Sequence, residues 1–208
     1  MSFLIGRKVK MDQIWDEDGK VIPVTVVQAG PVTVTQVKTQ EKDGYQSFQV
    51  GYDSSIKKIN KAMAGHLSAS GGKDLGKFRF LREFKPNNLE VNYTIGDKID
   101  ISAFNKGDKI KISGYEKGRG FQGVVKRHGL HGGPKTHGQK NRHRAPGSLG
   151  ATAPQRVVKG KKMAGRMGNE KVTIKTEIVE TDKEKGFLLI KGPVPGNKKN
   201  ILLIQKIN

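Results

Sequence analysis

Positively charged and histidine side chains gather in one stretch of the sequence, between Lys117 and Asn169. This stretch holds 13 of the 39 Lys and Arg and four of the five His, but none of the 19 Asp and Glu, so it carries +13 of the net charge of +20. Lys and Arg neutralise phosphate, and the planar imidazole of His can stack on a base or donate a hydrogen bond to phosphate. The pattern therefore predicts the binding of a polyanion by a localised surface.

RNA is the polyanion that fits the rest of this stretch. Its 12 Gly let the backbone pass close to packed helices, and no recognition helix, zinc finger or basic zipper indicates DNA. The alternative is a solvated basic linker, which would not need apolar side chains such as Phe121, Leu149, Met163 and Met167. We expect RNA contacts from Lys117, Arg119, Lys126, Arg127, His128, His131, Lys135, His137, Lys140, Arg142, His143, Arg144, Arg156, Lys159, Lys161, Lys162 and Arg166.

Two patterns in the same stretch are typical of other chemistry. Residues 118–123 have the spacing G-x-G-x-x-G, but a dinucleotide site needs an acidic residue about 20 positions further on, and the first one is Glu170. The four His could ligate a metal. However, they lie among many Lys and Arg and have no Cys or carboxylate nearby in the sequence, which disfavours the binding of a divalent ion. We therefore predict no metal site and no nucleotide cofactor.

No pattern elsewhere indicates catalysis. His66 has no Ser or Cys nucleophile motif around it and is interpreted as a helix-terminal or surface residue, and no G-x-x-x-x-G-K-[ST] loop is present. We expect no catalytic residue, no cofactor and no small-molecule substrate. Because the chain has no Cys and no apolar stretch typical of a signal peptide or membrane span, we expect a cytoplasmic protein without a membrane partner.

Strand patterns on both sides of the basic stretch predict a β body with one helix. The helix is expected at 54–68, where Ile56, Ile59 and Met63 have helical spacing, and it should stop at Gly71-Gly72. Asp18-Gly19 and Asp43-Gly44 are expected to form tight hairpin turns. The predicted strands are 3–10, 21–28, 31–39, 45–52, 78–84, 95–101, 109–115, 172–179, 186–191 and 200–206.

The basic stretch itself should lack a core. Only seven of its 53 residues are Val, Ile, Leu or Phe, so it cannot bury enough apolar surface to offset the entropy lost on ordering. In the isolated protein we expect it to be disordered, and we expect an anionic partner to order it.

Five motifs resemble those of a known family. They are HRAPGSLG at 143–150, KGKKMAGRMG at 159–168, GFQGVVKRH at 120–128, IGRKV at 5–9 and KGPVPG at 191–196. With them the chain resembles, over essentially its whole length, the bacterial ribosomal protein L-three family of the large subunit. The resemblance implies a mainly β (α+β) protein, in which a translation-factor-like closed β-barrel carries a small α+β insertion and a long, basic, largely non-regular loop.

The acid-free stretch and the strands on both sides of it set the expected domain limits, and the resemblance implies the insertion and the function. The barrel body should comprise 1–116 and 170–208, with the insertion at about 40–95, and 117–169 should penetrate ribosomal RNA. The implied role is a structural constituent of the cytoplasmic 50S subunit that binds 23S rRNA, contacts neighbouring large-subunit proteins and supports early assembly. The loop tip that should approach and stabilise the peptidyl-transferase centre consists of Gly147, Ser148, Leu149, Gly150, Ala151 and Thr152.

Two other functions stay open at this point. A free RNA chaperone or ribosome-assembly factor could carry the same basic arm, but it would leave the mature particle instead of remaining at one copy per subunit. An RNA-modifying enzyme would need a cofactor pocket for which the sequence has no motif.

Overall fold

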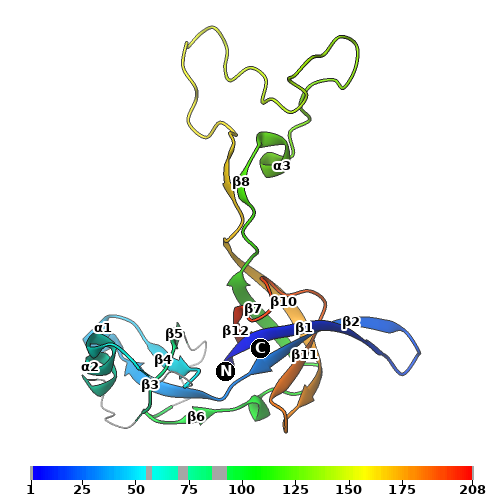
Figure 1. Cartoon of the computed structure of the whole chain (residues 1–208). Coiled ribbons are helices and arrows are strands. Elements are labelled where there is room, and N and C mark those ends of the chain that lie inside the picture. The colour runs from blue at the N-terminus through cyan, green and yellow to red at the C-terminus, as the bar shows by residue number, and fades with distance from the viewer. Residues whose placement is uncertain (1, 55–57, 70–74, 86–92, 208) are drawn as a thin grey trace. The chain divides into compact units, whose positions relative to one another are not determined.

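The computed structural model describes residues 2–54, 58–69, 75–85 and 93–207. The chain divides into two units, which we call the body (Met1–Tyr115 and Lys171–Asn208) and the extension (Glu116–Glu170). Strands are the main regular element, which confirms the prediction of a mainly β protein (Figure 1). Among the described residues, no helix is long and apolar enough to cross a membrane.

Six strands of the body form a closed ring. Every strand pairs antiparallel with two neighbours, and the last pairs with the first. In ring order they are β1 (Phe3–Trp15), β12 (Ile201–Lys206), β7 (Lys109–Tyr115), β10 (Lys171–Asp182), β11 (Phe187–Lys191) and β2 (Val21–Ala29).

Alternating apolar residues place the core inside this ring. On β7 the side chains of Ile110 and Ile112 are fully buried, and the Lys residues beside them in the strand are exposed. Leu202 and Ile204 of β12 lie beside this inward row in the strand register and are also fully buried. Gly114 continues the inward row on β7, where an added Cβ would lie 2.8 Å from Leu202 Cδ2. The sequence predicted the limits of β7 correctly because its alternation is uninterrupted.

A second sheet of four strands completes the body. Its order is β5 (Phe80–Phe84), β4 (Ser47–Tyr52), β3 (Val32–Lys38) and β6 (Lys98–Ile99), with α1 (Gln40–Asp43), α2 (Lys61–Ala69) and the 3-10 turn η1 (Ile101–Ala103). The aromatic ring of Phe3 in β1 stacks on that of Phe84 at a centroid distance of 4.5 Å, so the two sheets share one apolar core. The limits of the expected insertion, at about 40–95, stay a prediction.

Three local predictions were wrong. Asp43-Gly44 is not a tight hairpin turn, because the helical turn α1 joins β3 to β4 and ends at Gly44, which has φ 77°. The helix predicted at 54–68 begins only at Lys61, since Asn60 caps it by accepting a hydrogen bond from the Met63 amide at 2.7 Å. Residues 55–57 and the predicted stop at 71–72 lie outside the described residues.

The third error concerns the strand predicted at 95–101. Only Lys98–Ile99 pairs as a strand, and a turn precedes it. Gly96 has φ 99°, and the carboxylate of Asp97 accepts hydrogen bonds from the Thr94 amide at 2.7 Å and the Thr94 hydroxyl at 2.9 Å. These side-chain bonds favour a turn over an extended strand.

Other strands extend beyond their predicted ends. β1 was expected to end at Lys10 but runs to Trp15, and β10 runs to Asp182 instead of residue 179. In both strands a register shift interrupts the alternation, between Lys8 and Lys10 in one and between Ile178 and Glu180 in the other. A bulge of this kind hides the continuation of a strand from pattern reading.

Candidate nucleic-acid interface

The extension begins and ends in a short antiparallel ladder. β8 (Gly120–Gln122) pairs with β9 (Gly165–Met167), and the amide of Arg119 donates to Met167 O at 2.9 Å. Gly168 makes this close approach possible. Its φ is +76°, and a Cβ at this position would overlap the carbonyl oxygen of Lys117 on the opposite segment. Only glycine adopts this conformation here without strain or collision.

A short helix and one carbonyl group form a clasp beside this ladder. The helix α3 (Val124–His128) ends at Gly129, which has φ 68° and whose amide donates to Val125 O. In its last turn, Arg127 Nη1 and His128 Nε2 lie 2.8 and 3.0 Å from Met163 O. A carbonyl oxygen can only accept, so both nitrogens donate, which fixes the hydrogen of His128 on Nε2. The clasp joins segments that are 35 residues apart in sequence.

A second set of contacts closes the loop between Gly132 and His143. The amide of Gly133 donates to His143 O at 2.8 Å, and His143 Nδ1 donates to Pro134 O at 2.8 Å. Gly132 has φ +77°, and any side chain there would overlap His143 O. Backbone carbonyls and glycines therefore hold this loop closed, although its sequence is strongly basic.

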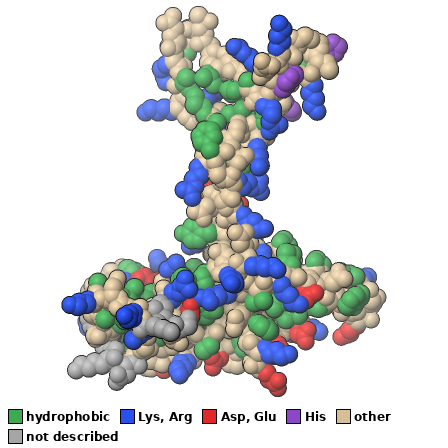
Figure 2. All heavy atoms as spheres, in the orientation of Figure 1, with side chains coloured by type: hydrophobic (Ala, Val, Ile, Leu, Met, Phe, Trp, Pro, Cys, Tyr) green, Lys and Arg blue, Asp and Glu red, His purple; other side chains and the backbone are tan. Residues whose placement is uncertain are grey.

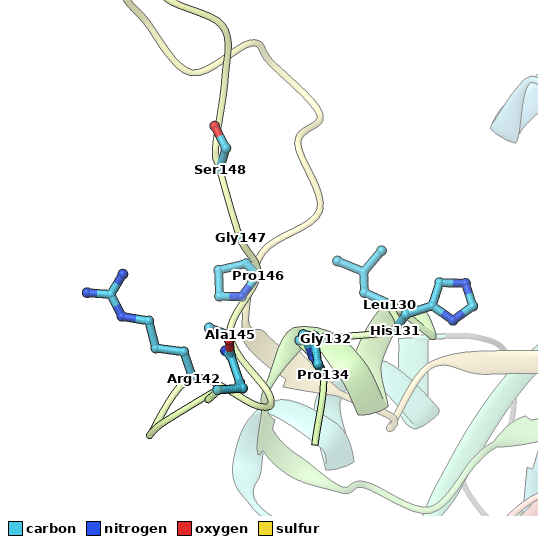
Figure 3. A pocket seen from close by; sticks show the side chains of 11 residues that line it. Leu130, His131, Gly132, Pro134, Arg142, Ala145, Pro146, Gly147 and Ser148 are labelled. Atoms are coloured by element: carbon cyan, nitrogen blue, oxygen red, sulfur yellow. The ribbon is translucent and has the colours of Figure 1, made fainter. Parts of the chain in front are cut away.

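The closed loop borders a hollow of about 760 Å³. Figure 3 shows it from close by, with Arg142, Pro146, Leu130 and His131 around it. Its lining residues are Leu130, His131, Gly132, Gly133, Pro134, Gln139, Arg142, Ala145, Pro146, Gly147 and Ser148. Proline and glycine residues line much of the hollow, and Arg142 and Gln139 add hydrogen-bond donors.

The predicted loop tip has space around Gly147 but less around Gly150, where an added Cβ would lie 3.2 Å from Arg156 O. Gly147 has φ +78°, and an added Cβ would meet no atom within 4 Å. The hydroxyl of Ser148 donates to Gly150 O at 2.8 Å, which fixes the turn locally. All six residues of the tip are exposed. Except for Leu149 the side chains of the tip are small, and contacts within the protein do not explain this at Gly147.

Most residues of the extension are exposed, including most of its cations. Only Val124 and Gly168 are buried among its residues, and 15 of the 17 side chains predicted to contact RNA are exposed. The exceptions, Arg127 and His128, are half-buried and belong to the clasp, so the structure gives them an internal role that the sequence did not reveal. Figure 2 shows the Lys and Arg side chains on several sides of this unit.

The arrangement supports phosphate binding better than any other chemistry. Between Glu116 and Glu170 there is no carboxylate to compete with phosphate for the cations. Among the described residues, no group of three His, Cys, Asp or Glu side chains could hold a metal ion. His131 and His137 are exposed and free to meet a base or a phosphate, whereas His143 uses one ring nitrogen to close its loop.

Exposed apolar side chains accompany the cations. Phe121 is 77% exposed on β8, and Val157 and Val158 are 44% and 54% exposed. An aromatic ring presented beside basic residues can stack on an unpaired base. Sequence reasoning named Phe121 but missed the two Val, whose only signal was their position inside a basic, otherwise polar run.

Comparison with known proteins identifies the family. A family model described as "Ribosomal protein L3" matches residues 88–185. The large ribosomal subunit protein uL3 of Herpetosiphon aurantiacus is 48% identical over 209 residues, which cover 99% of this chain and 96% of that protein. The chain belongs to the uL3 family. Proteins of the same name from Dehalococcoides mccartyi and Heliobacterium modesticaldum are 50% and 47% identical, and the alignments cover 98% and 97% of this chain and 97% and 95% of those proteins.

Membership in the uL3 family confirms the resemblance drawn from the five motifs. uL3 proteins are structural, non-enzymatic ribosomal proteins, so the chain is a ribosomal protein of the translation machinery. The contacts of individual side chains with RNA stay a prediction.

Proposed function

We propose that the chain is a structural constituent of the large ribosomal subunit and that its extension binds 23S rRNA. The observation that carries this proposal is the exposed, acid-free extension, which is held together mainly by hydrogen bonds to backbone carbonyls and presents most of its cations outward. A surface of this kind repels itself and gains most when phosphates neutralise it. The relatives are named large ribosomal subunit proteins, which supports rRNA as the polyanion.

The two units then have different tasks. The six-stranded ring is proposed to be a translation-factor-like closed β-barrel that, with the second sheet, docks as a folded body and contacts neighbouring ribosomal proteins. Residues 117–169 are proposed to penetrate the RNA, with contacts from the exposed Lys, Arg and His residues named above. A chain that binds RNA with one unit and presents a folded body with the other can bring RNA helices together early in subunit assembly.

We place the tip, Gly147–Thr152, near the peptidyl-transferase centre. This part of the proposal comes from the resemblance to the family. The tip's exposed backbone and small side chains support it, because they permit closer contact with RNA than larger side chains would.

Sedimentation tests the proposed function directly. Cell extract is separated on a density gradient, and the chain is quantified in every fraction against a known large-subunit protein. One copy per mature 50S subunit in cytoplasmic extract is the expected result. The second candidate, an RNA chaperone or assembly factor, predicts that the chain occurs only with immature particles or near the top of the gradient, and that result would overturn the proposal.

A further inference from the structure

A two-stranded arm extends from the ring of the body. β12 pairs with β1 only from Phe3 to Arg7, and β11 pairs with β2 only from Val24 onwards. Beyond these points β1 and β2 pair only with each other, as far as Trp15 opposite Val21 (Figure 1). We call residues 9–23 the arm. A two-stranded hairpin is marginally stable by itself in water, so further contacts would stabilise this one.

One face of the arm is exposed and mostly apolar, with Gln13 lying between Met11 and Trp15 and opposite Pro23. Met11 and Trp15 lie at alternating positions of β1 and therefore point to the same face, and the register places Val21 directly opposite Trp15. Their exposed fractions are 51%, 65% and 53%. Trp15 is the single Trp of the chain. Figure 2 shows hydrophobic side chains along this arm, with acidic ones beside them. These exposures show that the described part of the chain leaves this face open.

The charge of the arm is opposite to that of the protein. Its acidic residues are Asp12, Asp16, Glu17 and Asp18, and its basic residues are Lys10 and Lys20, so the arm carries −2 in a chain of +20. Both Lys already lie beside arm carboxylates: Lys10 Nζ is 2.5 Å from Asp12, and Lys20 Nζ is 3.3 Å from Asp18. Asp12 lies on the opposite face from Met11, so the acidic rim of the mostly apolar face is its turn end, where Asp16, Glu17 and Asp18 lie next to Trp15. Phosphate groups placed against this rim would be repelled.

We propose that the arm is a docking surface for a basic protein of the assembled particle, and not for RNA. The fitting partner has an apolar patch that covers Met11, Trp15 and Val21, and Lys or Arg side chains that meet Asp16 and Glu17. Protein–protein interfaces commonly have large aromatic side chains in their core and polar or charged side chains at their rim. The inference rests on the proposed function, because it takes that particle to be the large ribosomal subunit.

Site-specific photo-cross-linking tests this inference in the intact subunit. The full chain is expressed with a benzophenone amino acid in place of Val21, which leaves Trp15 and the acidic rim unchanged. Large subunits are purified, irradiated and treated with ribonuclease, and the adducts are analysed by mass spectrometry. The expected product is a cross-link to a second, basic protein that survives ribonuclease. A cross-link to RNA, or no cross-link at all, would overturn the inference.

Two variants and a matched control define the contact. Trp15→Ala removes the apolar centre and Glu17→Lys reverses one rim charge, and each is expected to lower the cross-link yield about twofold or more. The loss stays partial because the docked body holds the arm near its partner. Glu184→Lys changes another exposed Glu, in the turn between β10 and β11, and should leave the yield unchanged. An equal loss in the control would refute the assigned surface.

The two levels of the proposal fail in different ways. If the chain is missing from large-subunit fractions, the proposed function falls and the inference falls with it. If the chain is present at one copy but residue 21 cross-links to RNA, only the inference is wrong. Trp15 and Glu17 are exposed, so neither variant removes a contact of the buried core.

Discussion

Removing three Lys from the extension should flatten the salt dependence of RNA binding by a calculable amount. Lys159, Lys161 and Lys162 are exposed, and no carboxylate lies within the extension between Glu116 and Glu170. The logarithm of the binding constant falls linearly as the logarithm of the salt concentration rises. Each phosphate that the protein neutralises makes this line steeper by about 0.7 to 0.9. If each Lys meets one phosphate, the triple Ala variant should lose about 2.1 to 2.7 of this slope.

The corresponding change in affinity is large enough to measure. Between about 50 and 200 mM salt, the binding constant of the unmodified chain should fall about 20-fold to 40-fold more than that of the variant. The assay is filter binding to a 23S rRNA fragment at several salt concentrations, with both proteins measured on the same RNA.

A matched control separates local contacts from a change in net charge. Lys10, Lys20 and Lys185 are also exposed, but each lies within 2.5 to 3.9 Å of a carboxylate in the body. Replacing these three with Ala removes the same charge and should leave the slope unchanged. If the extension variant keeps the wild-type slope, or if the control loses as much, the three Lys of the extension do not bind phosphate.

Three further perturbations test other parts of the reasoning. Trypsin should cut residues 117–169 rapidly in the free chain and slowly in the assembled subunit, while the body survives; equal protection in the free chain would show that RNA is not needed for order. Gly147→Trp should leave incorporation intact but alter the peptidyl-transfer rate or the sensitivity to drugs at that centre, unlike Lys140→Gln; wild-type values for both would mean that the tip does not approach the centre. Gly168→Ala and Gly160→Ala both place a side chain at positive φ, at a cost of about 1 to 2 kcal/mol, but only the methyl group added at position 168 would also collide with backbone. Hydrogen exchange should therefore show greater loss of β8–β9 protection in Gly168→Ala, and equal loss in both variants would contradict the close approach at Gly168.

The strands of the ring were largely predictable because each carries a local signal. β7, β11 and β12 were located to within a residue at each end, since fully buried Ile or Leu alternates with more exposed residues along each of them. The turn at Asp18-Gly19 was also correct, because Gly19 has φ 74° and joins β1 to β2. The predictions that failed depended on hydrogen bonds of single side chains. Asn60 caps the helix and Asp97 stabilises a turn, and hydrophobic periodicity reveals neither hydrogen bond.

The segment that holds the candidate interface could be located from the sequence, but the different contacts of its side chains could not. Composition alone located the basic extension, because a run of 53 residues without an acid is visible in the sequence. It could not distinguish Arg127 and His128 from the other cations, since their partner is a backbone carbonyl 35 or more residues away. A carbonyl acceptor leaves no mark in the sequence.

The absence of acids has a second consequence, for the stability of the extension itself. The ion pairs found among the described residues all lie in the body, so the cohesion of the extension comes from the β8–β9 ladder, the clasp on Met163 and the closed loop at His143. These few contacts must offset the mutual repulsion of 13 cations, and only two residues of the extension are buried. If the extension binds RNA as proposed, phosphates that neutralise the cations would stabilise its fold in the same step in which they are bound. Order and RNA affinity would then be one linked equilibrium, and the glycines at positive φ, such as Gly168, would define the conformation that RNA selects.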